Sequence, residues 1–208
     1  MHIPKTNTLQ IELEGFYDAL QRANEPNESY DINKWLYVPC TYSEYRYILG
    51  TKGEMPLVCI GINPSTAEPD NLDNTLKSVE RIAHSNGYDS FIMFNVYAQR
   101  ATRPQDMENV LNMQMHRENM RAFEYIMSLS KKSKPAVWAA WGTIIEAREY
   151  LPSCVRDMIE IGKKYGAVWY SAGARSKKAG HPHHPLYLSK QSRLEHFDVS
   201  EYLDSLEI

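Results

Sequence analysis

The chain has 208 residues, of which 43% are hydrophobic, and its formal net charge is −3. This length and composition are typical of one globular domain with a sizeable core, and the charge excludes a polycationic nucleic-acid binder, so any nucleic-acid contact must use a local patch. Three scattered cysteines, Cys40, Cys59 and Cys154, form no CxxC motif, which argues against a disulfide framework and against a zinc or iron–sulfur site.

The first part of the chain predicts one helix and a pair of extended segments. Apolar residues at helical spacing predict an amphipathic helix over residues 7–23, and a polar loop follows to residue 34. Residues 35–49 are typical of extended segments or an edge hairpin. The opening residues do not resemble a signal peptide, and no apolar run approaches the roughly 18 residues of a membrane span, so we expect a cytoplasmic protein.

A short buried strand comes next and ends in a polar turn. Residues 57–62 are mostly apolar, as in a strand covered on both faces, and Gly61 leaves room for close backbone approach. Pro64 lacks an N–H and disfavours the helical conformation at Asn63, so the chain must turn there.

Strands and helices alternate from that turn onward. Asp73 or Asn74 can cap a helix that ends near His84. The later predicted elements are a strand over 91–94, a helix from about 107 to 129, a strand over 136–141, one or two helices over 143–164, a strand over 167–170 and a short C-terminal helix. The alternation predicts a single α/β domain over 1–208, with helix and extended segments over 1–50, a core of parallel sheet between helical layers over 55–190 and the last helix in 191–208.

Polar side chains follow each of the four predicted parallel strands, whose carboxyl ends meet at one sheet edge, where open α/β sheets bind ligands. The candidate ligand-binding residues are Gly61, Asn63, Pro64, Ser65 and Thr66 after the first strand, Asn95, Tyr97, Arg100 and Arg103 after the second, Trp141 and Gly142 after the third, and Lys177, His181, His183 and His184 after the fourth. Amides can read a nucleobase edge, arginine and lysine neutralise phosphate, and histidine donates to a developing anion. The edge therefore predicts a site for a polar, phosphate-bearing ligand.

Structural interpretations stand beside the functional ones. Asn63 could cap its turn, the two arginines could pair with Glu68 or Asp70, and Trp141 could pack in the core. The sequence has no GxGxxG, P-loop or GxSxG motif, and its acidic residues match no standard metal site, so we expect no cofactor and no metal.

Four motifs in a fixed order carry a family resemblance. They are Asn63-Pro64-Ser65-Thr66-Ala67, Asn95 followed by Arg100-Ala101-Thr102, Ala140-Trp141-Gly142, and His184-Pro185-Leu186-Tyr187-Leu188. On these motifs the chain closely resembles, over roughly residues 43–190, a bacterial and phage family known as domain of unknown function 1643. That family name conveys no activity.

The same motifs resemble, more distantly, the uracil-DNA glycosylase superfamily. This resemblance implies a three-layer α/β/α sandwich around a four-stranded parallel sheet. It also implies that Asn63, in the place of the Asn or Asp of a GxNP or GxDP motif, positions the attacking water. Asn95 would read the base edge, and His184 would stabilise the leaving base as its anion.

The late His-Pro motif has two possible counterparts in this sequence. Either His181-Pro182 or His184-Pro185 fits, and we favour His184 because Pro185-Leu186 continues the pattern. Leu186 or Tyr187 would then be the residue that wedges into DNA.

The chain departs from the superfamily in the segment after its first motif. Many glycosylases supply an aromatic ring there to stack on the base, but no aromatic residue occurs between Pro64 and Gly87. Tyr97 is the candidate substitute. The acidic residues Glu68, Asp70 and Asp73 also disfavour a track for DNA phosphates.

Three functions remain as alternatives. The first is an N-glycosidic hydrolase acting on a nucleobase in DNA or in a free nucleotide, with Arg100, Arg103 and Lys177 holding phosphate. The second is a non-catalytic nucleic-acid or nucleotide-binding module. The third is a hydrolase or transferase of another class in which Ser65 or Asp73 is active. The expected partner is a nucleic acid or nucleotide rather than a membrane, and the sequence does not determine the oligomeric state.

Overall fold

A computed structural model describes the chain except for residues 6, 131–132 and 207–208, and the side chain of Tyr187 also lies outside the described part. Seven strands form one mixed sheet in the order β1-β2-β4-β3-β5-β6-β7. The strands are β1 (Trp35–Val38), β2 (Ile48–Thr51), β3 (Pro56–Gly61), β4 (Ser90–Asn95), β5 (Ala136–Ala139), β6 (Val168–Ala172) and β7 (Leu194–His196). The α-helices are α1 (Phe16–Ala23), α2 (Asn74–Ser85), α3 (Met113–Leu129), α4 (Leu151–Lys164) and α5 (Val199–Ser205), and 3-10 turns cover Thr8–Gln10, Pro104–Asp106, Gly142–Ala147 and Pro185–Tyr187.

The α/β class predicted from the sequence is confirmed, but the sheet is larger than expected. Its four central strands, β4, β3, β5 and β6, are parallel neighbours. The hairpin of β1 and β2 extends the sheet beyond β4, and β7 adds to β6, in both cases antiparallel. The sequence pattern does not reveal β7, because its three residues carry no alternation.

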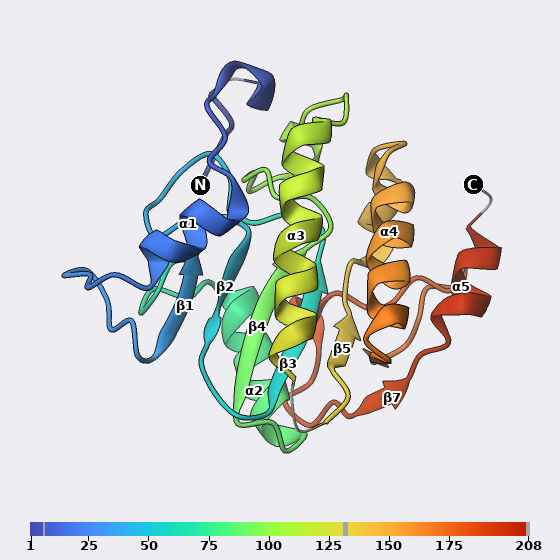
Figure 1. Cartoon of the computed structure of the whole chain (residues 1–208). Coiled ribbons are helices and arrows are strands. Elements are labelled where there is room, and N and C mark those ends of the chain that lie inside the picture. Colours follow the sequence, from blue (N-terminus) through green and yellow to red (C-terminus); the bar gives the residue numbers. More distant parts are fainter. Residues whose placement is uncertain (6, 131–132, 207–208) are drawn as a thin grey trace.

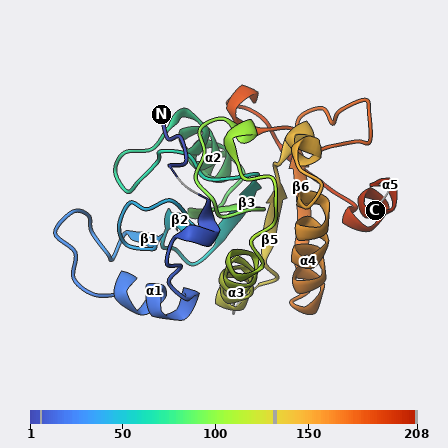
Figure 2. The same cartoon turned by 90° about the horizontal axis from the view of Figure 1, so that it is seen from above.

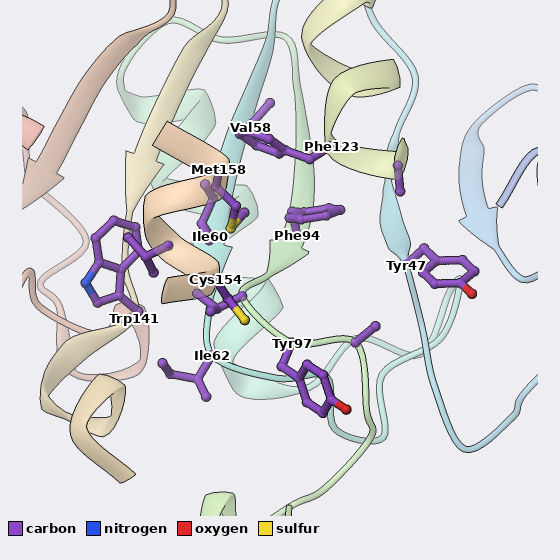
Figure 3. Close-up of a cluster of buried hydrophobic side chains, with 14 of the residues drawn as sticks. Tyr47, Val58, Ile60, Ile62, Phe94, Tyr97, Phe123, Trp141, Cys154 and Met158 are labelled. Carbon is purple, nitrogen blue, oxygen red and sulfur yellow. The ribbon is translucent and has the colours of Figure 1, made fainter. Parts of the chain in front are cut away.

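Helices cover both faces of the sheet (Figures 1 and 2). Helices α1, α3 and α4 lie on one face and α2 lies on the other. The core is divided accordingly. On the first face Ile60 and Phe94 pack with Phe123 of α3 (Figure 3), whereas Cys59 and Met93 pack under α2. None of the helices in the described part of the chain is long and apolar enough to cross a membrane.

Two predicted helices begin later than expected. The helix predicted over 7–23 is only a 3-10 turn followed by α1, whose first N–H, from Phe16, donates to the buried Glu118 carboxylate at 2.9 Å. The helix predicted from 107 begins at Met113 because Asn112 caps it, accepting from the N–H groups of Gln114 and Met115.

Candidate functional site

A cavity of about 750 Å³ opens at the carboxyl ends of β3 and β4, beside the start of α2 and the loop that follows β6. We call it the edge cavity. Its volume lies within the usual range of small-molecule sites. Of the residues predicted from the sequence, Gly61, Asn63, Ser65, Thr66, Asp73, Asn95, Gly142, His181, His183, His184 and Leu186 line it. The fold therefore brings Asn63, Asn95 and His184 to one cavity.

Strand alternation brings the first two segments to this cavity. Cys59 and Met93 face α2, so the residues two positions later, Gly61 and Asn95, face the same side and are paired in register. A Cβ at Gly61 would lie 2.6 Å from the Met93 methyl group and 3.2 Å from the Asn95 amide. Glycine therefore leaves the space in which the Asn95 side chain sits.

Asn63 is anchored through one end of its amide. Its Nδ2 donates to the carbonyl oxygens of Ala101 at 2.7 Å and of Pro64 at 3.1 Å, and the Ala101 N–H donates to Pro64 O at 2.9 Å. These bonds tie the loop after β3 to the loop after β4. The amide oxygen of Asn63 accepts no hydrogen bond from the described residues, so it is available to a water or a ligand in the edge cavity.

Asn95 is buried at the end of β4. In the amide orientation that suits its neighbours, Nδ2 donates to the carbonyl oxygens of Asn63 and Phe94, each at 3.3 Å. The remaining oxygen can accept from a ligand N–H, which is the chemistry needed to read a base edge.

His184 has a defined tautomer. It caps the turn Pro185–Tyr187, and its Nδ1 accepts from the Leu186 N–H at 3.3 Å. In the neutral ring the proton is therefore on Nε2, which has no protein partner in the described part of the chain. Burial, and then the neighbouring His183, lower the pKa of His184, while Asp73 acts in the opposite direction. At pH 7 the ring is a neutral donor.

His181 also lines the cavity, but both of its nitrogens are engaged. Tyr202 accepts from the Trp141 indole at 2.9 Å and donates to His181 Nδ1 at 2.9 Å, so Nε2 donates to Glu146 at 3.2 Å. A ligand would have to displace one of these partners. This favours His184 over His181 as the residue that meets a ligand.

Two predicted ligand-binding aromatic residues lie in the core instead (Figure 3). The Tyr97 hydroxyl donates to Glu108 and accepts from the Asn112 N–H at 3.1 Å, and its ring packs on Tyr150. Trp141 is fully buried because strand alternation turns it away from α2, onto the face of α3 and α4. Tyr97 and Trp141 therefore lie in the core and not in the wall of the edge cavity, in contrast to their predicted position.

The three predicted phosphate-binding cations also miss the cavity. Arg100 is buried and donates to the carbonyl of Ser65 and to the Tyr37 hydroxyl. Arg103 is exposed and pairs with Asp106 at 2.9 Å, and Lys177 is exposed outside the cavity. The predicted partner Asp70 pairs instead with Lys34, at 2.8 Å. Of the other candidates, Pro64 is buried outside the cavity lining, and the Tyr187 side chain is not in the described part.

The alternative with an active Ser65 or Asp73 finds no supporting contact. The Ser65 hydroxyl lies 3.1 Å from that of Thr102, and no histidine of the described chain is hydrogen-bonded to it. Asp73 Oδ1 caps α2 by accepting from the Leu76 N–H at 2.9 Å. Within the described residues, no three histidine, cysteine or acidic side chains gather as metal ligands.

Sequence reasoning missed part of the cavity wall. Arg46, Met93, Thr75 and Thr102 line it, and apart from histidine no aromatic side chain does so in the described chain. Thr102 belongs to one of the motifs on which the family resemblance rests, so the sequence could have indicated it as a cavity residue. Arg46 precedes the second strand of a predicted edge hairpin, where a charged residue is ordinarily exposed.

Comparison with known proteins gives one family. The sequence model of a family described as "Protein of unknown function (DUF1643)" matches residues 46–186. That segment contains every residue that lines the edge cavity. No curated protein and no solved structure matches the chain.

Proposed function

Since the chain belongs to the DUF1643 family, whose description names no activity, we propose from its edge cavity that it hydrolyses the N-glycosidic bond between a nucleobase and a sugar. The observation that supports this proposal most directly is that Asn63, Asn95 and His184, from three segments distant in sequence, line one cavity of about 750 Å³. One free amide oxygen, one base-reading amide and one neutral imidazole donor are the groups that this reaction requires.

The proposal includes a uracil-DNA glycosylase-like fold. Its support is the block of four parallel strands, β4-β3-β5-β6, with helices on both faces. The Gly61-Ile62-Asn63-Pro64 turn and the His184-Pro185 turn lie at the same edge of that block. The three antiparallel strands are then additions at the rims of the sheet.

The chemistry divides between Asn63 and His184. The Asn63 amide oxygen accepts a hydrogen bond from water and directs it to the sugar carbon. As the water oxygen bonds to that carbon, the carbon–nitrogen bond breaks and the base leaves with the electron pair. Nε2–H of His184 donates to the departing base and stabilises its negative charge. The proton lost by the water neutralises the base.

Base release should depend on pH in a way that identifies the form of His184. Because its pKa is lowered, the ring stays neutral below the ordinary histidine value of about 6.5. Protonation of His184 would add a proton to Nδ1. This nitrogen could then no longer accept from the Leu186 N–H, and the cap of the Pro185–Tyr187 turn would be lost. We therefore expect a rate that is constant from pH 8 through 6.5 and falls only at more acidic pH. A rate that rises from pH 8 to 6 would contradict this assignment, since it would require the imidazolium.

The direct test is release of free base from nucleoside monophosphates and from DNA containing uracil or modified bases. We expect release by the native chain and a rate about 100-fold lower in His184→Asn, because asparagine can keep the turn cap but not the Nε2 donor. His196→Asn, an exposed change on β7, is the matched control and should retain the native rate. Equal rates in His184→Asn and the native chain would refute the proposed role of His184 as the donor to the departing base.

A second candidate function is a non-catalytic nucleotide-binding module. The observation that favours it is the absence of aromatic rings, other than imidazoles, from the described cavity wall, since stacking commonly contributes about 1–3 kcal/mol per base. Binding of nucleotides with no base release from any substrate of the panel would support this module over the hydrolase.

A further inference from the structure

Arg46 is a buried cation on the wall of the edge cavity. It lies just before β2 and is 1% exposed, yet it forms no ion pair with any described residue. Its Nη1 donates to the Ala67 carbonyl at 3.0 Å, whereas its Nε has no partner. A buried charge is costly unless it is paired, so this arrangement calls for a counter-charge that the protein itself does not place there.

A second buried arginine adds to the unpaired positive charge beside the cavity. Arg100 is 0% exposed, and its Nη1 also faces the Ala67 carbonyl, at 3.4 Å, so both guanidinium groups converge on one oxygen. Its other partners are the Ser65 carbonyl, the Tyr37 hydroxyl and the face of the Tyr42 ring, all of them uncharged. Burial and the charge of Arg100 lower the pKa of Arg46 to about 9.

Acidic residues nearby do not neutralise this pair. Asp73 lines the same cavity and raises the pKa of Arg46 through its charge, but the two side chains form no ion pair in the described structure. Its Oδ1 is occupied by the Leu76 N–H at the start of α2. Glu68 influences Tyr37 and Tyr42 by its charge without pairing with either arginine.

The first turn of α2 supplies donors on the same wall. Asn74 and Thr75 line the cavity, and their backbone N–H groups, the first two of the helix, have no acceptor among the described residues. Hydroxyl groups of Ser65, Thr66 and Thr102 line it as well. A helix start combined with an arginine and hydroxyl groups is chemistry suited to a phosphate.

We infer that Arg46 and the first turn of α2 bind the phosphate monoester of a nucleoside monophosphate in the edge cavity. This inference rests on the proposed function and narrows its substrate class to free mononucleotides. Three exposed cations already have acidic partners, Arg103 with Asp106, Lys178 with Glu146 and Lys34 with Asp70, and this favours a mononucleotide over DNA. Proteins that bind DNA use such cations to neutralise several phosphates.

Equilibrium binding, measured by calorimetry, tests the phosphate site. The probes are inorganic phosphate, the common nucleoside 5′-monophosphates and the corresponding nucleosides. For the native chain we expect each monophosphate to bind about 10- to 100-fold more tightly than its nucleoside. We also expect phosphate to raise the melting temperature. In Arg46→Gln both effects should disappear, while Arg156→Gln, an exposed change on α4, should retain them.

Two results of the binding experiment would overturn the inference. One is equal affinity of the native chain for nucleosides and monophosphates, which needs no variant and so holds even if Arg46→Gln does not fold. The other is tighter binding of single- or double-stranded DNA than of mononucleotides. Phosphate-dependent binding without base release would instead leave this site standing and refute only the proposed hydrolysis. Base release from nucleosides as fast as from monophosphates would refute only the phosphate site.

Discussion

Replacing Asn63 by alanine is expected to slow base release about 10²- to 10⁴-fold, the range associated with loss of a positioned group that handles the reacting water. The Asn63 amide oxygen is the acceptor in the edge cavity that would orient water, and Nδ2 holds that oxygen in place through Ala101 and Pro64. The loss should fall on kcat, because substrate binding depends on other residues of the wall. The measurement is steady-state base release at saturating nucleotide.

The stability of this variant separates chemistry from folding. Loss of two hydrogen bonds to carbonyl groups should lower the free energy of unfolding by only about 1–3 kcal/mol. Urea denaturation should therefore show a folded protein at assay temperature. Asn33→Ala, an exposed change in the loop before β1, is the matched control and should alter neither quantity. An unchanged kcat in Asn63→Ala would remove this residue from the reaction.

The site residues that could be predicted from the sequence are those next to strand ends. Apolar runs separated by helical patterns identify the parallel strands, and the carboxyl ends of such strands meet at one edge. Asn63 and Asn95 follow from that rule because a polar residue at the end of a buried strand cannot enter the core without a partner. His184 lies well beyond the end of β6 and was predicted from its His-Pro motif instead.

The direction of a side chain beyond a strand end could not be predicted in the same way. The sequence is apolar at every position from 136 to 141, so no contrast between polar and apolar residues reveals which face Trp141 occupies. Tyr97 lies two residues after Asn95, but the strand has ended and the loop carries its ring to the opposite face.

The sequence also did not indicate which charged side chains are buried. Arg100 and Arg103 are separated by three positions in one loop, yet one is fully buried and the other is exposed. Arg46 reaches the cavity only because its backbone pairs with the loop after β4, where its N–H donates to Ala98 O at 2.9 Å. Such long-range pairing depends on the whole sheet, and no local pattern specifies it.

The buried position of Trp141 leads to the largest expected change in stability. Its ring is 0% exposed and packs against Trp169, Phe197 and Tyr202, and its indole N–H donates to the Tyr202 hydroxyl. Trp141→Ala should therefore lower the free energy of unfolding by about 3–5 kcal/mol, measured by urea denaturation. Tyr17→Ala, which removes a ring that is 57% exposed, should cost about 1 kcal/mol or less.

A conservative change distinguishes packing from ligand contact at the same position. Trp141→Phe keeps an aromatic ring in the core but leaves the Tyr202 hydroxyl without its indole donor, so we expect a loss of about 1–3 kcal/mol. Nucleotide affinity of the folded variant should equal that of the native chain, because Trp141 lies on the face of the sheet away from the edge cavity. A stability close to that of the native chain together with weakened nucleotide binding would instead place Trp141 in the site. Tyr202 links this cluster to His181, so the core behind the cavity and the imidazole on its wall are held by the same hydroxyl group.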